Sequence, residues 1–217
     1  MRLLSWKSLP WLLLLALATT GCRSSYYSVM ETFGKHKRDL LRDALEDASE
    51  ENLKAVEQFE DALTQLKGLT GFDGGDLEKQ YNAFKSDYDG CRDRSTAVRS
   101  RIEKVDRVAQ DLFAEWEREL KEIQSTQLRG RSQAKLTETR TRYQQVHAAL
   151  TRSEATLEPV LSQMKDYVLY LKHNLNARAI GSIKDEALEI ENEIGKLIAE
   201  ITRSIQETEG FLKVLDE

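Results

Sequence analysis

The sequence has little proline, cysteine or histidine, and these shortages restrict both its fold and its chemistry. It contains two prolines, two cysteines and three histidines in 217 residues. His36, His147 and His173 have no second histidine or cysteine at the spacing of metal ligands, so we expect them at the surface or its boundary. No P-loop, GxGxxG, HExxH or GxSxG motif is present. We therefore expect a non-catalytic protein without a metal or a cofactor.

The first stretch, MRLLSWKSLPWLLLLALATTGC, has the layout of a secretory signal. Arg2 and Lys7 give it a positively charged start, and an apolar run at 9–18 follows. A membrane-spanning helix needs about 20 apolar residues, and this run is shorter. We therefore predict a signal peptide at residues 1–21 that is removed from the mature chain.

Two cleavage sites are compatible with this signal. The ALA stretch at 16–18 suits ordinary signal peptidase, which would leave Cys22 as a thiol. The TTGC stretch at 19–22 resembles the lipobox of bacterial lipoproteins, although that family usually has leucine where Thr19 stands. The resemblance implies a diacylglyceryl group on the sulfur of Cys22, cleavage before it and acylation of the new amino group. Residues 22–25 would then form a lipidated tether ahead of a helical domain at 26–217.

The same resemblance predicts where the protein resides. In lipoproteins of this kind aspartate after the cysteine favours the inner membrane, and Arg23 here implies the outer membrane, facing the periplasm. Several acyl chains on one residue make the attachment lasting, because a single chain binds only marginally. The basic run KHKR at 35–38 is a candidate for contact with the membrane surface.

An excess of positive charge is also missing. Without Arg2 and Lys7 the chain has 30 basic and 37 acidic residues, which is a net charge of −7. Nucleic-acid binding requires a basic footprint, so we expect no nucleic-acid partner. Abundant charge with little proline and glycine is instead typical of long helices.

Apolar residues recur at steps of four and three through most of the remaining sequence, which is the pattern of a coiled-coil seam. The clearest stripe predicts a nearly unbroken helix at 77–123. Others predict helices at about 25–67, from just after Gly130 to about 175, and at 183–215. Pro159 lies in the third stripe, which keeps its phase, so we expect a kinked helix there and not a loop. The four stripes consist of Phe33, Leu40, Ala44, Ala48, Ala55, Phe59, Ala62 and Leu66; Leu77, Tyr81, Phe84, Tyr88, Cys91, Ser95, Val98, Ile102, Val105, Ala109, Leu112, Trp116 and Ile123; Leu136, Tyr143, Val146, Leu150, Ser153, Leu157, Val160, Met164, Leu171 and Leu175; and Ile183, Ala187, Ile190, Ile194, Leu197, Ile201, Ile205, Leu212 and Leu215.

The breaks between stripes predict the topology. Four glycines in GLTGFDGGD at 68–76 end the first helix, and Asp76 can cap the second. If the second and third helices meet around Arg129, antiparallel pairing places Gly181 level with Leu77. An isoleucine stripe running past that point would face water, which is unfavourable. We therefore predict a fold-back near Gly181, the alternative being one long helix whose overhang is buried by a second copy. The predicted fold is an all-α, elongated antiparallel bundle of three to four long helices.

The segment LKHNLNARAIGSI at 171–183 adds a family resemblance. In a heptad-rich chain behind a lipoprotein-type signal, it resembles a bacterial family of helical coiled-coil proteins known only as a domain of unknown function. The resemblance covers most of the mature chain. It implies an all-helical fold and assigns neither an activity nor a site.

Several stripe residues are also candidates for a functional site. Cys91 is either a small core residue or a thiol that crosslinks two chains. Tyr81, Phe84, Tyr88 and Trp116 can line a pocket, although aromatic residues at heptad spacing are usually core.

Charged residues offer two further candidates. Arg129, Arg131, Arg140 and Arg142 gather near one predicted bundle end, where they either meet acidic lipid headgroups or form a solvated face. Asp73 and Asp76 hint at calcium, but an EF-hand needs a longer series of ligands, so a capped turn is the better interpretation.

Together these features predict a membrane-tethered, non-catalytic coiled-coil protein of the bacterial cell envelope. Acylated Cys22 would hold it on the lipid membrane, where it would act as a scaffold, spacer or adaptor for an unknown envelope protein. The alternative is a bundle that binds a small or lipidic ligand between its helices, around Tyr81, Phe84 and Tyr88. The oligomeric state, including a homo-oligomer, stays open.

Overall fold

The structure is a computed structural model that describes residues 37–71 and 76–215, and these residues are helical apart from short turns. The chain divides into two compact units, Met1–Leu40 and Leu41–Glu217. Residues 37–40 of the first unit are helical, and the bundle is formed within the second. The helices are α3 (Lys37–Thr70), α4 (Leu77–Glu122), α5 (Thr126–His173), α6 (Ala177–Ser182) and α7 (Lys184–Leu215).

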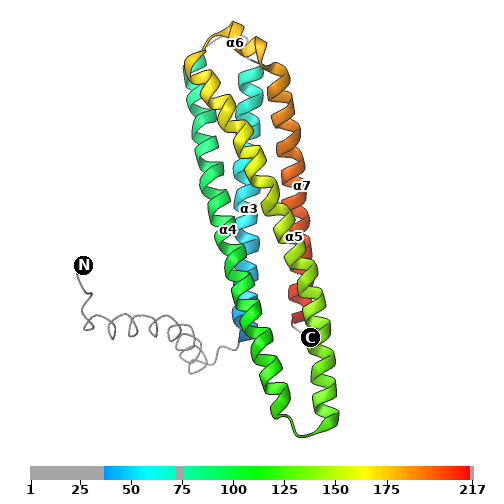
Figure 1. The fold of residues 1–217 in the computed structure, drawn as a ribbon. Helices are drawn as coiled ribbons and strands as arrows, with labels where there is room; N and C mark the ends of the chain where they lie inside the picture. Colours follow the sequence, from blue (N-terminus) through cyan, green and yellow to red (C-terminus); the bar gives the residue numbers. More distant parts are fainter. Residues whose placement is uncertain (1–36, 72–75, 216–217) are drawn as a thin grey trace, which may run out of the picture. The chain divides into compact units, whose positions relative to one another are not determined.

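Four long helices of the second unit run side by side and alternate in direction (Figure 1). α4 packs along α5, and α5 packs along α7. α3 contacts α4 through an ion pair between Glu51 and Arg94 at 3.0 Å. It contacts α7 through a hydrogen bond from Asn52 Nδ2 to Ser204 Oγ at 3.2 Å. The prediction of an all-α antiparallel bundle of long helices is therefore confirmed.

The predicted stripes form most of the core. Nearly all of their described members are buried, among them Phe59, Phe84, Leu150, Met164 and Ile194, whose side chains are fully enclosed. The helix continues through Pro159, as its unbroken stripe predicts. Phe33 lies outside the described residues.

The buried face of α4 and of α7 shifts by one residue near one end of the bundle. In α7, Phe211 is buried and the predicted Leu212 is only half-buried. In α4 the stripe predicts Trp116 and Ile123, but Phe113 and Leu120 are buried and the predicted pair is only half-buried. An ideal helix drifts away from a strict seven-residue repeat, so a long straight stripe rotates out of the core. Ring contacts occupy the space: Phe113 meets Tyr143 of α5 at a centroid distance of 5.6 Å.

The turn between α4 and α5 lies earlier than the sequence predicts. We expected the helices to meet around Arg129, with the new helix beginning after Gly130, but α5 begins at Thr126. Ser125 caps it, because its side chain accepts a hydrogen bond from the Leu128 amide at 3.3 Å. Gly130 lies inside the helix with open space around it, and a single exposed glycine costs only about 1 kcal/mol in a helix.

The predicted fold-back is confirmed, but it too begins earlier than expected. α5 ends at His173, and Gly181 lies inside the short α6. The Asn174 side chain donates to the Tyr170 carbonyl at 3.0 Å and so satisfies a backbone group at the end of α5. Ile183 then forms the turn before α7, which returns along α5 (Figure 1).

Helix ends at the α3–α4 connection agree with the sequence more closely. α3 continues to Thr70, three residues past the predicted end at Lys67. The predicted cap at Asp76 is confirmed, because its Oδ1 accepts a hydrogen bond from the Lys79 amide at 3.0 Å. Asp73 lies outside the described residues.

Candidate functional site

A groove of about 460 Å³ opens between the last turns of α5 and the start of α7. We call it the α5–α7 groove. Its volume is within the usual range of small-molecule sites. The lining residues are Gln163, Asp166, Tyr167, Tyr170, Ile183, Glu186, Glu189 and Ile190.

Two buried polar atoms line this groove without a hydrogen-bond partner among the residues that the structure describes. They are the Tyr167 hydroxyl and the Gln163 Oε1 atom. Tyr167 is only 4% exposed, and its ring packs edge-on against Phe84 of α4 at a centroid distance of 5.8 Å. Buried polar atoms in folded proteins nearly always have a partner. Two of the four unpartnered ones among the described residues line this groove, and the other two, Asn52 Oδ1 and Gln80 Oε1, do not.

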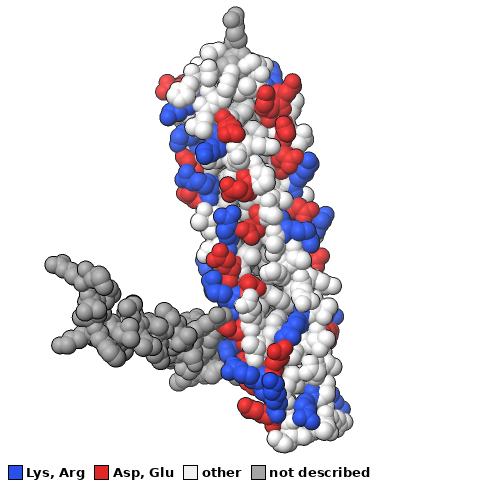
Figure 2. Space-filling view, viewed as in Figure 1, with Lys and Arg blue, Asp and Glu red and all other residues white. Residues whose placement is uncertain are grey.

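The electrostatic character of the groove is acidic. Asp166, Glu186 and Glu189 line it, and among the described residues none of them has an ion pair or a side-chain hydrogen bond. Burial, together with the nearby charges of Glu186 and Glu191, raises the pKa of Tyr167 to about 12. Figure 2 shows acidic side chains along the upper part of the bundle, where α7 begins. Because its pKa is raised, the Tyr167 phenol stays protonated at any physiological pH and can donate or accept a hydrogen bond.

The predicted aromatic site is placed differently from the groove. Phe84 is fully buried, Tyr81 is 8% exposed and Tyr88 is half-buried. None of the three lines the α5–α7 groove. Phe84 instead packs against the ring of Tyr167, which does line the groove. Trp116 donates from Nε1 to Ser132 Oγ at 2.8 Å across the α4–α5 hairpin. These contacts agree with the core interpretation of the aromatic stripe.

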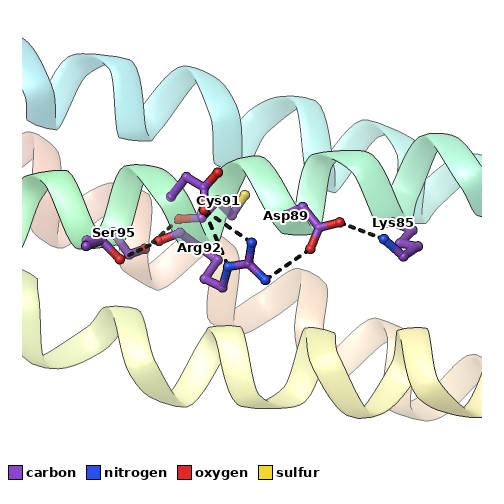
Figure 3. Close-up of polar contacts among 7 residues, drawn as sticks. Lys85, Asp89, Cys91, Arg92 and Ser95 are labelled. Carbon is purple, nitrogen blue, oxygen red and sulfur yellow. Dashed lines mark hydrogen bonds and ion pairs between the residues drawn. The ribbon is translucent and has the colours of Figure 1, made fainter.

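Cys91 is a free and fully buried thiol on α4 (Figure 3). Its sulfur lies 3.4 Å from the Gln58 carbonyl of α3 and donates a weak hydrogen bond to it. Burial, reinforced by Asp87 and Asp61, raises the pKa of the thiol well above its ordinary value. A thiol in this position is unreactive because the thiolate is the nucleophile, and it agrees with the core interpretation of Cys91.

Exposed charges border the buried cysteine. Lys85 and Asp89 form an ion pair at 2.7 Å, and Asp89 also meets Arg92 at 3.3 Å, as Figure 3 shows. The Ser95 hydroxyl donates to the Cys91 carbonyl at 2.7 Å. All four side chains act within α4, so this cluster supports the helix itself and presents no cleft for a ligand.

The predicted arginine cluster is partly neutralised within the bundle. Arg140 pairs with Glu117 at 2.8 Å and lies over the Phe113 ring at 5.0 Å. Arg142 pairs with Glu138 at 3.2 Å. Among the residues that the structure describes, Arg129 and Arg131 are exposed and have no such pair, which favours the solvated-face interpretation.

The remaining predicted site residues divide into two groups. His147 is near Asp106 at 3.6 Å, and His173 is exposed. Within 37–71 and 76–215 no cluster of three or more histidine, cysteine or acidic side chains is arranged to hold a metal. Cys22, His36 and Lys35 lie outside the described residues.

Sequence reasoning did not find the α5–α7 groove. Its residues come from two helices that meet only after the chain folds back at 174–183. The sequence gives no signal for it, because Val168 continues the four-three spacing between Met164 and Leu171, and Asp166 and Tyr167 look like ordinary helix positions.

Fold and sites define this chain as an antiparallel helical bundle with a small acidic groove at one end. The chain belongs to the family described as "Protein of unknown function (DUF2959)", whose model matches residues 26–215. The resemblance to a family of unknown function is thus confirmed at the level of the family. No curated protein matches the chain. None of the described helices is long and apolar enough to cross a membrane.

Proposed function

We propose that this protein is a membrane-tethered, non-catalytic helical bundle of the bacterial cell envelope. It acts there as a scaffold, spacer or adaptor for a partner protein. The observation that carries the proposal is the length of the α4–α5 hairpin, whose helices have 46 and 48 residues. At 1.5 Å per residue each helix is about 70 Å long, which is a large reach for a small chain.

Contacts along the hairpin support a stiff spacer. Arg99 of α4 pairs with Glu154 of α5 at 2.8 Å near the middle. Trp116 meets Ser132 near the tip. Between these points the two helices share buried apolar residues and the ring pair of Phe113 with Tyr143. Such continuous packing holds a helix pair in one geometry more firmly than isolated surface pairs do.

The tether belongs to the proposal through the TTGC stretch and Arg23 after it. Acylation of Cys22 would place the bundle on the outer membrane, facing the periplasm, and the helices would extend its reach from there. Several acyl chains make such attachment lasting.

Intact mass of protein purified from membranes tests the tether. We expect a chain that begins at Cys22 and carries the mass of several acyl groups, and we expect a Cys22→Ala variant to lose this mass and leave the membrane fraction. A Cys91→Ala variant is the matched control, because it removes the other cysteine and leaves lipidation unchanged. A wild-type chain that begins at Thr19 without added mass would overturn the tether.

A second candidate function is ligand binding, and the α5–α7 groove favours it. The groove combines a volume of about 460 Å³ with two unpartnered buried polar atoms. A concave surface with a few polar groups is the usual form of a small-molecule site. In this case the bundle would bind its ligand between α5 and α7, and not around Tyr81, Phe84 and Tyr88.

A further inference from the structure

The α5–α7 groove has a wall that accepts hydrogen bonds and negative charge at its rim. Gln163 Oε1 is an acceptor by nature, and the Tyr167 hydroxyl has free lone pairs. Asp166, Glu186 and Glu189 add three carboxylates, whereas the described lining residues include no lysine, arginine or histidine. A group that brings hydrogen-bond donors and positive charge complements every polar feature of this surface.

Local helix chemistry explains only part of the acidity. Glu186 lies in the first turn of α7, where a carboxylate is favourable because of the helix dipole. Asp166 is in the interior of α5, and Glu189 lies beyond the first turn of α7. These two carboxylates face the groove without that explanation, and neither has a partner among the described residues.

The Tyr167 hydroxyl is the independent sign of a ligand. Its side chain is 4% exposed, so water reaches it poorly, yet its oxygen has no partner in the bundle. The hydroxyl is close enough to the start of α7 for the charges of Glu186 and Glu191 to raise its pKa, and Tyr167 lines the groove. A donor group that enters the groove would satisfy this oxygen, and no group of the described chain does so.

The other walls of the groove are apolar. Ile183 and Ile190 line it together with the tyrosine rings. Three large apolar side chains near this end are exposed: Leu169 by 48%, Tyr170 by 39% and Leu188 by 55%. A ligand with an apolar stem would cover part of this surface, and such burial is favourable.

We infer that the α5–α7 groove binds a small organic cation, an ammonium group carried on an apolar stem. The ammonium group donates to the Tyr167 hydroxyl and Gln163 Oε1 and is attracted by Asp166, Glu186 and Glu189, while the stem covers Ile183 and Ile190. This inference rests on ligand binding, the second candidate function, and names the ligand class for it.

Titration of the purified protein with hexylammonium chloride, followed by NMR chemical shifts, tests the inference. We expect shifts confined to residues around 163–190 and binding at least about tenfold tighter than that of hexanoate, weakening as salt screens the carboxylates. 1-Hexanol is the neutral probe. If hexanol binds as tightly as hexylammonium, the groove does not select a cation, and the ligand-binding function is still supported. If none of the three probes binds, both the ligand class and the ligand-binding function are wrong.

Matched variants locate the cation. Tyr167→Phe and Glu189→Gln should each weaken hexylammonium binding several-fold, because each removes one partner of the ammonium group. Glu209→Gln is the control, since this exposed carboxylate of α7 lies outside the groove and should leave binding unchanged. Equal affinity of all four proteins would overturn the site.

The stability of the Tyr167→Phe variant distinguishes a ligand-binding role of the hydroxyl from a structural role. The hydroxyl has no partner among the described residues, so its removal should leave the urea midpoint unchanged or raise it while binding weakens. A lowered midpoint would assign the hydroxyl a structural role and overturn its role as a ligand acceptor.

A capped Gly-Lys-Gly peptide distinguishes two sources of the same chemistry. Tighter binding of the peptide than of hexylammonium would identify the lysine side chain of a protein as the source. Tighter binding of hexylammonium would identify a free small amine. Either result supports the ammonium group as the recognised chemistry.

Discussion

The seam between α3 and α4 and the interface between α5 and α7 are built from different contacts. Across the first, Asp47 meets Arg101 at 3.3 Å and Lys104 at 2.9 Å, and Arg94 meets Glu51 at 3.0 Å. Across the second, none of the ion pairs of the described residues joins the two helices, and the ring contact of Tyr143 with Phe211 is typical. One seam is thus charged at its edges, and the other is largely apolar.

The two kinds of contact are expected to contribute differently to the stability of the fold and to the relative position of the helices. Exposed ion pairs contribute about 0–1 kcal/mol each, because water and salt screen them. A buried apolar side chain contributes about 1.5–3 kcal/mol. We therefore expect the α5–α7 interface to provide more of the free energy of unfolding, and the α3–α4 pairs to fix the relative position of two helices joined by a glycine-rich connection.

Truncation on the buried face of α7 should have the largest effect. Ile194 is fully enclosed, so Ile194→Ala removes buried methyl groups and leaves a cavity. We expect a loss of about 2–4 kcal/mol in the free energy of unfolding, measured by urea denaturation. Leu188→Ala is the matched control on the same helix, because Leu188 is 55% exposed and its loss should change stability by less than about 0.5 kcal/mol. Equal effects would contradict the contribution of the buried face of α7 to stability.

Removal of a charge from the α3–α4 seam should have a smaller effect that depends on pH. The hydrogen bond from Lys104, with the charges of Lys104 and Arg101, lowers the pKa of Asp47. A carboxyl with a lowered pKa stabilises the fold above its ordinary pKa, and this contribution is lost as the pH falls through the folded value.

Asp47→Asn should therefore cost up to about 1 kcal/mol at pH 7, since the carboxylate is 41% exposed and screened. At a pH below the lowered pKa the variant and the wild type should have the same stability, and high salt should shrink the difference at pH 7. Urea denaturation at both pH values measures this. A difference that persists at low pH would mean that Asp47 acts through packing and not through its charge.

Helix positions and the fold-back were predictable because both depend on periodicity. The stripes indicated each long helix, and burial of the isoleucine stripe favoured a return of the chain over one long helix covered by a second copy. The turn at 123–125 was misplaced for a local reason. Gly130 looked like a breaker, whereas a single capping residue, Ser125, determines where α5 begins. Arg129, placed at the turn by the sequence, lies in the first turns of the helix.

The α5–α7 groove was not predictable because it depends on residues that meet only in three dimensions. Glu186 and Glu189 are separated from Tyr167 by the whole α5–α7 connection. In the sequence their charges look like any solvated helix face. Only the structure shows that an unpartnered buried hydroxyl lies with them in one groove.

A second carboxyl of the α3–α4 seam should give the smallest effect, with the opposite sign. Burial, together with the negative charge of Asp61, raises the pKa of Asp87, although Gln58 donates to it at 3.4 Å and acts in the other direction. A carboxyl with a raised pKa opposes folding while it is ionised, so its contribution improves as the pH falls through the folded value. Asp87→Asn keeps an acceptor for Gln58 and removes the charge, and we expect it to equal or exceed the wild type at pH 7 by a few tenths of a kcal/mol. Urea denaturation of Asp47→Asn and Asp87→Asn at pH 7 compares them directly. If both variants lose stability, the Asp87 carboxylate stabilises the fold, and both carboxylates of the α3–α4 seam then raise the free energy of unfolding.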